Sequence, residues 1–239
     1  MTKADGREAV GAIAARLRGP LLSVMVGTSA RHPARLRVPA KATQAVLRRT
    51  SDQRRYDVTI SAQSAFVWYR VPKVASRSIL GALVDNGVKF TTEHPYKVVV
   101  PQRLTDTFFK FAFTRDPFAR LVSCWQNKVV AGNKFGLSPQ LHEELQEFSA
   151  FIDYVEGLDI DTCDPHIRSQ SALIDINRMD FIGRLENFTS DFRYVSEQIG
   201  IRLVELPRLN ASTPHSFHDS AELRRRVEAI YHDDMSRLS

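Results

Sequence analysis

A short loop at residues 71–78, VPKVASRS, combines the residue types that bind an oxyanion. Lys73 supplies a full positive charge, while Ser76 and Ser78 supply hydroxyl donors. The loop follows the apolar run at 65–69 and precedes a helix-like apolar run. Where such a loop joins a strand to a helix, free backbone N–H groups at the helix start point at one anion, and the helix dipole adds partial positive charge. We therefore predict that this loop binds a tetrahedral anion.

The loop differs from the usual nucleotide-binding loop G-x-x-x-x-G-K-[ST], whose Ser or Thr ligates magnesium. Here Lys73 is followed by Val74, and the next glycine is Gly81. A loop of this kind suits one tetrahedral group and makes little provision for a metal, so we predict no metal site. The alternative is an ordinary helix N-terminus with serine caps and an exposed lysine.

A second segment, FKFAFTRDPFARLVSCW at 109–125, also points to an anion. Its apolar part predicts a strand that brings Arg115 to the strand end, and Pro117 suits the first turn of a helix. Ser123 lies eight residues after Arg115, so both can face one pocket if the helix starts beside the strand end. The planar guanidinium fits phosphate oxygens, and the serine adds a short donor. The alternative is that Arg115 pairs with Asp116 or another carboxylate.

The elements that must position these residues follow from hydrophobic periodicity. Strand-like runs at 65–69, 109–113 and 179–182 alternate with helix-like windows. Helices are expected at 117–130, at 140–156, at 189–199 and after Ser220, which can cap the last one. The alternation predicts an α/β fold with three layers and a mostly parallel central sheet.

The first 55 residues have a different character from the rest. Residues 7–18 have the pattern of a short amphipathic helix, and eight of the residues from Arg31 to Arg55 are basic against one acid. We predict a helical, basic extension at 1–55 followed by one domain at 56–239. The basic segment is either a solvated connection or a rim that attracts an acidic substrate.

The composition is that of a globular protein with an anionic ligand. The net charge of +6 raises the local concentration of anions, without choosing among nucleotide, polysaccharide and nucleic acid. The two cysteines, Cys124 and Cys163, are too few for a disulfide framework and fit a reducing compartment. The longest early apolar stretch, Leu21 to Val26, is too short to span a membrane. We expect a cytoplasmic protein with no membrane span.

Together, VPKVASRS and RDPFARLVS resemble the sulfotransferases, specifically the carbohydrate sulfotransferase branch with the chondroitin and HNK-1 type enzymes and their bacterial relatives. The similarity covers roughly residues 64–236. Further similar segments are FSAFIDYV, DPHIRSQSALI, DFIGRLENFTSDFRYV and LPRLNAS. The resemblance implies a P-loop-NTPase-like sulfotransferase fold and, as donor, 3′-phosphoadenosine-5′-phosphosulfate (PAPS) held without a metal.

In that family the first loop holds the 5′-phosphosulfate and the second segment holds the 3′-phosphate. The resemblance therefore implies that Lys73 contacts the leaving oxygen and that Asn210 and Ser212 belong to a loop closing over the donor. The predicted donor-binding residues are Lys73, Ala75, Ser76, Arg77, Ser78, Arg115, Ser123, Asn210 and Ser212.

Sulfuryl transfer also needs a base to take the proton of the attacking hydroxyl. TTEHPYKV at 91–98 lies where relatives carry a catalytic Glu or His, which makes Glu93 and His94 candidates. Of these two we favour His94, because relatives that modify uronic acids place a histidine in this segment. His166, in DPHIRSQ, matches a histidine on the family's acceptor side and is the third candidate. Each could instead be a polar surface residue.

Arg168 and Gln170, beside His166, are predicted to bind hydroxyl, carboxylate or sulfate groups of the substrate. The alternative for them is a capped turn before a helix.

The sequence thus predicts a PAPS-dependent sulfotransferase with a hydroxyl acceptor, a saccharide first and a small lipid or secondary metabolite second. A phosphate-loop kinase or NTPase is disfavoured, because the loop glycines, the Lys-[ST] pair and a Walker-B acid are missing. The other alternative is a non-enzymatic basic module that binds polyanionic glycan or nucleic acid, with steep salt dependence. We expect no nucleic-acid partner.

Overall fold

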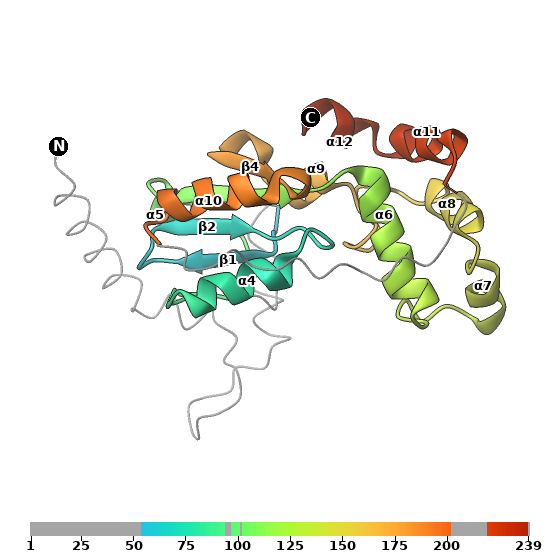
Figure 1. Ribbon diagram of the computed structural model, residues 1–239, viewed down its shortest axis with the longest axis horizontal. Helices are drawn as coiled ribbons and strands as arrows, with labels where there is room; N and C mark the ends of the chain where they lie inside the picture. Colours follow the sequence, from blue (N-terminus) through green and yellow to red (C-terminus); the bar gives the residue numbers. More distant parts are fainter. Residues whose placement is uncertain (1–53, 94–96, 101, 202–218, 239) are drawn as a thin grey trace, which may run out of the picture.

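The computed structural model describes residues 54–93, 97–100, 102–201 and 219–238. Its sheet has four strands in the order β1-β2-β3-β4 (Figure 1). The strands are β1 (Val58–Ser61), β2 (Phe66–Tyr69), β3 (Phe109–Thr114) and β4 (Phe181–Arg184). β1 is antiparallel to β2, while β2, β3 and β4 are mutually parallel neighbours. The predicted α/β fold with a mostly parallel sheet is confirmed.

Three of these strands lie within two residues of their predicted positions, whereas β1 was not predicted. Its sequence, VTIS, alternates apolar and polar residues, yet all four side chains are buried. The Ser61 hydroxyl is satisfied by donating to the Lys89 carbonyl over 2.8 Å. With only four residues, this alternation is at the lower limit of a recognisable strand pattern.

Both faces of β2 and β3 are covered, which explains their continuous apolar runs. On one face, α10 (Phe188–Gln198) packs Phe188 and Phe192 against Phe113, with ring centroids 5.5 and 6.2 Å apart. α4 (Ser76–Asp85) buries Ile79 and Leu83 in the same core. Figure 1 shows α4 and α10 on different sides of the β1–β2 pair.

Helices build a second core beside the sheet. They are α6 (Pro117–Trp125), the π-helix η1 (Gln126–Val130), α7 (Pro139–Glu144), α8 (Phe148–Glu156) and α11 (Ala221–Ile230). The helix predicted at 117–130 therefore ends in a π-turn. The single helix predicted at 140–156 is wrong, because α7 ends before Leu145, whose carbonyl accepts from the Trp125 indole over 2.9 Å.

The remaining described elements are short. They are α5 (Gln102–Thr105), α9 (Gln170–Leu173), η2 (Ile176–Arg178), η3 (Leu185–Asn187) and α12 (His232–Arg237). Ser220 caps α11 as predicted, accepting from the Leu223 N–H over 3.2 Å. The predicted helix at 7–18, and all of the 1–55 extension except its last two residues, lie outside the described residues. In the part of the chain that is described, no helix has the length and apolar character needed to cross a membrane.

The parallel strands bring distant loops to one edge of the sheet. Tyr69 is in register with Ala112, and Thr114 with Arg184. The segments that follow β2, β3 and β4 therefore leave the sheet at the same edge, where ligands bind in open α/β sheets. The loop with Lys73 is one of these segments.

Candidate functional site

The loop after β2 has an unusual backbone. Lys73 and Ala75 both adopt left-handed conformations, with φ of 72° and 59°. This conformation costs a residue with a Cβ roughly 1–2 kcal/mol. The Ser76 hydroxyl closes the loop by donating to the Val71 carbonyl over 2.9 Å. The loop thus makes without glycine the sharp turns that nucleotide loops make with it, and such strain concentrates at functional sites.

The N-terminus of α4 presents open backbone donors. The Ala75 carbonyl accepts from the N–H groups of Ser78 and Ile79, over 2.9 and 3.1 Å. Among the described residues, none accepts from the N–H groups of Ala75, Ser76 or Arg77. Because the helix dipole reinforces these donors, the turn can bind an anion.

Positive charges surround this turn. Burial lowers the pKa of Lys73 to about 8, and the charges of Lys128, Lys134 and Arg77 act in the same direction. Lys128 comes from η1, and π-turns occur frequently at functional sites. An anion bound at Lys73 would relieve this repulsion and offset the cost of burying the charge.

His166 lies within the electrostatic range of the same cluster. Its Nδ1 is 2.9 Å from Asp164 Oδ1, which also accepts from the His166 N–H over 2.8 Å. Burial lowers the pKa of His166, helped by Lys128 and Lys73, while the hydrogen bond to Asp164 opposes the shift. Since a carboxylate can only accept, the shared hydrogen belongs to Nδ1, and Nε2 is the basic atom of the neutral ring.

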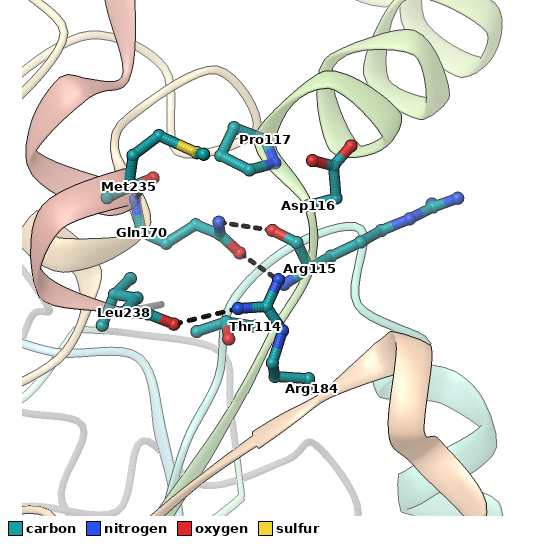
Figure 2. A pocket seen from close by; sticks show the side chains of 9 residues that line it. Thr114, Arg115, Asp116, Pro117, Gln170, Arg184, Met235 and Leu238 are labelled. Atoms are coloured by element: carbon teal, nitrogen blue, oxygen red, sulfur yellow. Dashed lines mark hydrogen bonds between the residues drawn. The ribbon is translucent and has the colours of Figure 1, made fainter. Parts of the chain in front are cut away.

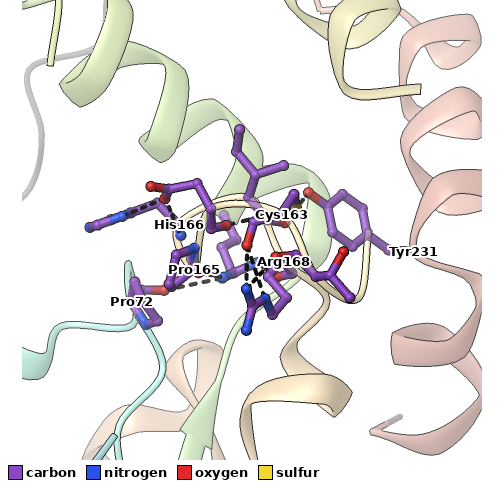
Figure 3. A network of polar contacts seen from close by, with 10 residues as sticks. Pro72, Cys163, Pro165, His166, Arg168 and Tyr231 are labelled. Atoms are coloured by element: carbon purple, nitrogen blue, oxygen red, sulfur yellow. Dashed lines mark hydrogen bonds and ion pairs between the residues drawn. The ribbon is translucent and has the colours of Figure 1, made fainter. Parts of the chain in front are cut away.

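One buried arginine connects the two segments. Arg120, only 1% exposed, donates to the carbonyls of Pro72, Pro165 and Arg168 over 3.1, 3.0 and 2.8 Å. Figure 3 shows Pro72 facing the turn that carries Pro165 and His166. Pro72 and Pro165 are the residues immediately before Lys73 and His166.

The backbone of Arg115 is fixed by hydrogen bonds, while its guanidinium forms no ion pair with a described carboxylate. The Gln170 amide donates to the Arg115 carbonyl over 2.8 Å and accepts from the Arg115 N–H over 3.0 Å (Figure 2). Asp116 caps α6 by accepting from the Ala119 N–H over 2.8 Å. Arg115 makes no ion pair with any described carboxylate, although Glu186 and Asp116 partly oppose the lowering of its pKa by burial.

A small pocket lies beneath this turn. Figure 2 shows that the Arg115 side chain extends away from the pocket that its backbone helps to line. On the other side, the Asp234 carboxylate of α12 accepts from the N–H groups of Gln170 and Ser171, both over 2.8 Å. Gln170 is 1% exposed. The pocket therefore belongs to the framework that holds Arg115.

The other predicted residues lie in several places. Ser123 is half-buried on α6, and Arg77 is exposed in the first turn of α4. Glu93 is exposed. Its neighbour Thr92 pairs with Ile60 of β1, and Ile60 pairs with Val67 in the amino-terminal half of β2. The backbone of Glu93 therefore lies toward the amino-terminal end of β2, whereas the Lys73 loop follows its carboxyl end. His94, Asn210 and Ser212 lie outside the described residues.

The two residues predicted to bind the substrate are engaged within the protein. Both polar groups of the Gln170 amide are occupied by Arg115. Arg168 is half-exposed and donates from Nε to the Cys163 carbonyl over 3.0 Å. A substrate contact stays a prediction for Arg168, whereas Gln170 acts here as a brace.

Sequence reasoning missed four residues of the site: Arg120, Lys128, Asp164 and Asp234. A signal existed for two of them, because Arg120, Cys124 and Lys128 recur every four residues on one side of a predicted helix. No local pattern indicates Asp234, whose partners lie 63 and 64 residues away. Within the described ranges, His, Cys, Asp and Glu form no group suited to a metal ion.

The chain was compared with protein families, with curated proteins and with solved structures. The sequence profile of the sulfotransferase family matches residues 56–239, which include every element described above. Comparison with curated proteins and with solved structures gives no match.

Proposed function

Because the chain belongs to the sulfotransferase family, an enzyme family of sulfuryl transfer to acceptors, we propose that it uses PAPS as donor and the hydroxyl group of a saccharide as acceptor. The observation that supports this proposal is the convergence of Lys73, the open N–H groups of the α4 turn and His166. These groups supply a binding site for a phosphosulfate and a base beside it.

The residues of the turn fit this donor. The N–H groups of Ala75, Ser76 and Arg77 have no acceptor among the described residues. The pKa of Lys73 is lowered by burial first and then by the charges of Lys128, Lys134 and Arg77, so a bound anion would stabilise its charged form. Arg115, with its guanidinium outside any described ion pair, would bind a second phosphate together with Ser123. PAPS carries phosphate groups at both ends of its ribose and supplies the sulfuryl group.

Lys73 would act on the leaving group. Its pKa of about 8 keeps it mainly protonated at neutral pH, so its charge can stabilise the negative charge that develops on the bridging oxygen. Because the backbone of Lys73 is constrained, the charge is placed before the reaction and needs no reorganisation. Electrostatics and positioning of this kind carry most of the rate in the related phosphoryl transfers.

His166 is the base that we propose among the three candidates. Arg120 donates to the carbonyls of Pro72 and Pro165, the residues before Lys73 and His166, which supports a position of His166 beside the donor loop. Burial lowers the pKa of His166, which favours the neutral ring at pH 7. Nε2 would take the proton of the acceptor hydroxyl, while Asp164 holds the ring through Nδ1. A base so placed contributes about 10²–10⁴-fold to the rate.

The surroundings of His166 favour an acidic acceptor. Burial and the charge of Arg168 lower the pKa of Lys97, while the carboxylates of Asp57 and Asp164 oppose this shift. Arg168 lies two residues after His166, and both its charge and that of Lys97 would gain from a carboxylate or sulfate on the acceptor. A saccharide with such groups fits better than a neutral lipid.

The donor is tested by thermal stabilisation with 3′-phosphoadenosine-5′-phosphate, the product of PAPS, against AMP and against ATP with magnesium. At 100 times its dissociation constant, a ligand should stabilise the fold by roughly 2.7 kcal/mol. Arg115→Ala should lose the advantage of the bisphosphate over AMP. Stabilisation by ATP with magnesium and not by the bisphosphate would show that this donor is incorrect.

A further inference from the structure

Arg120 lies where the two halves of the site meet. It comes from α6, between Arg115 and Ser123, and its three hydrogen-bond partners are 45 to 48 residues away in the sequence. Nε bonds to the loop that carries Lys73, while both terminal nitrogens bond to the turn that carries His166. One rigid planar group thus spans the donor side and the base side of the site.

The chemistry of these contacts requires arginine. The three carbonyl oxygens accept from three different nitrogens of the planar guanidinium, whereas the three donors of a lysine all sit on one nitrogen and cannot reproduce this spread. No described carboxylate pairs with Arg120, although the side chain is only 1% exposed. Burying a cation without a counter-ion is costly, so the arrangement is explained best by what it holds in place.

We propose that Arg120 is a positioning residue that fixes Lys73 and His166 relative to one another and transmits donor binding to the 164–168 turn. This inference rests on the proposed function, in which the two residues act on opposite sides of the transferred group. A shift of about 1 Å between reacting groups can cost about 10² in rate. In this proposal, the alignment of Lys73 with His166 depends on the three hydrogen bonds of Arg120 and not on its charge alone.

Arg120→Lys tests the positioning role, because it keeps the positive charge and loses the planar guanidinium that bonds three carbonyls. We expect kcat to fall about 10²-fold while the dissociation constant of the bisphosphate changes less than about tenfold, because the donor-binding groups remain. The acid limb of the pH profile should also move, since the Asp164–His166 pair is no longer anchored. Arg226→Lys is the matched control, because Arg226 bonds to Asp153 and Glu156 of α8. It should lower the free energy of unfolding and leave kcat and the pH profile unchanged.

A second measurement is independent of turnover: hydrogen exchange with and without the bisphosphate. In the unaltered protein, the bisphosphate should slow exchange both at 71–78 and at 162–169. In Arg120→Lys it should slow exchange only at 71–78, and in Arg226→Lys at both segments.

The outcomes separate the two proposals. Protection of both segments in Arg120→Lys, or of 71–78 alone in the unaltered protein, would overturn the positioning role and leave the donor intact. Protection of neither segment in the unaltered protein would overturn the donor, and this inference with it. The measurement on the unaltered protein can overturn the positioning role even if Arg120→Lys does not fold.

Discussion

The side-chain amide of Gln170 pairs with both backbone polar groups of Arg115, donating over 2.8 Å and accepting over 3.0 Å. β3 ends at Thr114, so the backbone N–H and carbonyl of Arg115 bond to the Gln170 amide and not to a neighbouring strand. This pairing sets the direction in which the Arg115 side chain leaves the sheet. The backbone N–H of Gln170 donates to the Asp234 carboxylate, so α12 holds Gln170 in place and, through it, Arg115.

Gln170→Leu should weaken donor binding through Arg115. Two backbone groups lose their partners, and an unsatisfied buried group costs about 1–3 kcal/mol. We expect a lower free energy of unfolding by urea and weaker calorimetric binding of the bisphosphate. Asn86→Ala, which removes a 2.8 Å hydrogen bond at the far end of α4, should cost stability alone. Unchanged bisphosphate affinity in Gln170→Leu would contradict this role.

Bisphosphate affinity should depend on the protonation of Lys73. The free protein has a Lys73 pKa of about 8, lowered by burial, and a bound anion raises it, so binding takes up a proton. Affinity should therefore be higher below about pH 8 and fall as the pH rises above it. Calorimetry in buffers of different ionisation enthalpy measures the proton uptake. Lys73→Arg, which stays charged, should remove the dependence; if the dependence persists, another group titrates.

Removing His166 should slow turnover strongly and spare donor binding. His166→Ala should lower kcat about 10²–10⁴-fold with little change in bisphosphate affinity. Because burial lowers the pKa of His166, the acid limb of kcat/KM should lie below its ordinary value of 6.5. Asp164→Asn removes a group that raises this pKa, so the limb should move to lower pH.

Glu93→Gln is the control for the base and should keep its turnover, since Glu93 has no described contact with Lys73 or His166. Full activity in His166→Ala would exclude His166 and make His94→Ala the next variant to assay.

Asp234→Asn should destabilise the protein through the framework that holds Gln170 and Arg115. The buried carboxylate, 2% exposed, accepts from the N–H groups of both Gln170 and Ser171. An amide would face one of these donors with its own NH₂ group, at a cost of about 1–3 kcal/mol. Urea denaturation measures the loss. Asp233→Asn, exposed on the same helix, should be neutral, and equal stability of the two variants would rule out the proposed role of Asp234.

The sequence by itself determined the anion loop at 71–78, the segment with Arg115 and the parallel strands that bring both to one edge. These features depend on short-range periodicity and on the residues that start a helix, which a chain displays locally. Only the tertiary structure decided that Gln170 braces Arg115, that Asp234 holds Gln170 and that Arg120 joins the 71–78 loop to the 164–168 turn. Those contacts join residues 45 to 64 positions apart, and packing, not local pattern, selects which distant carbonyl or amide each side chain meets.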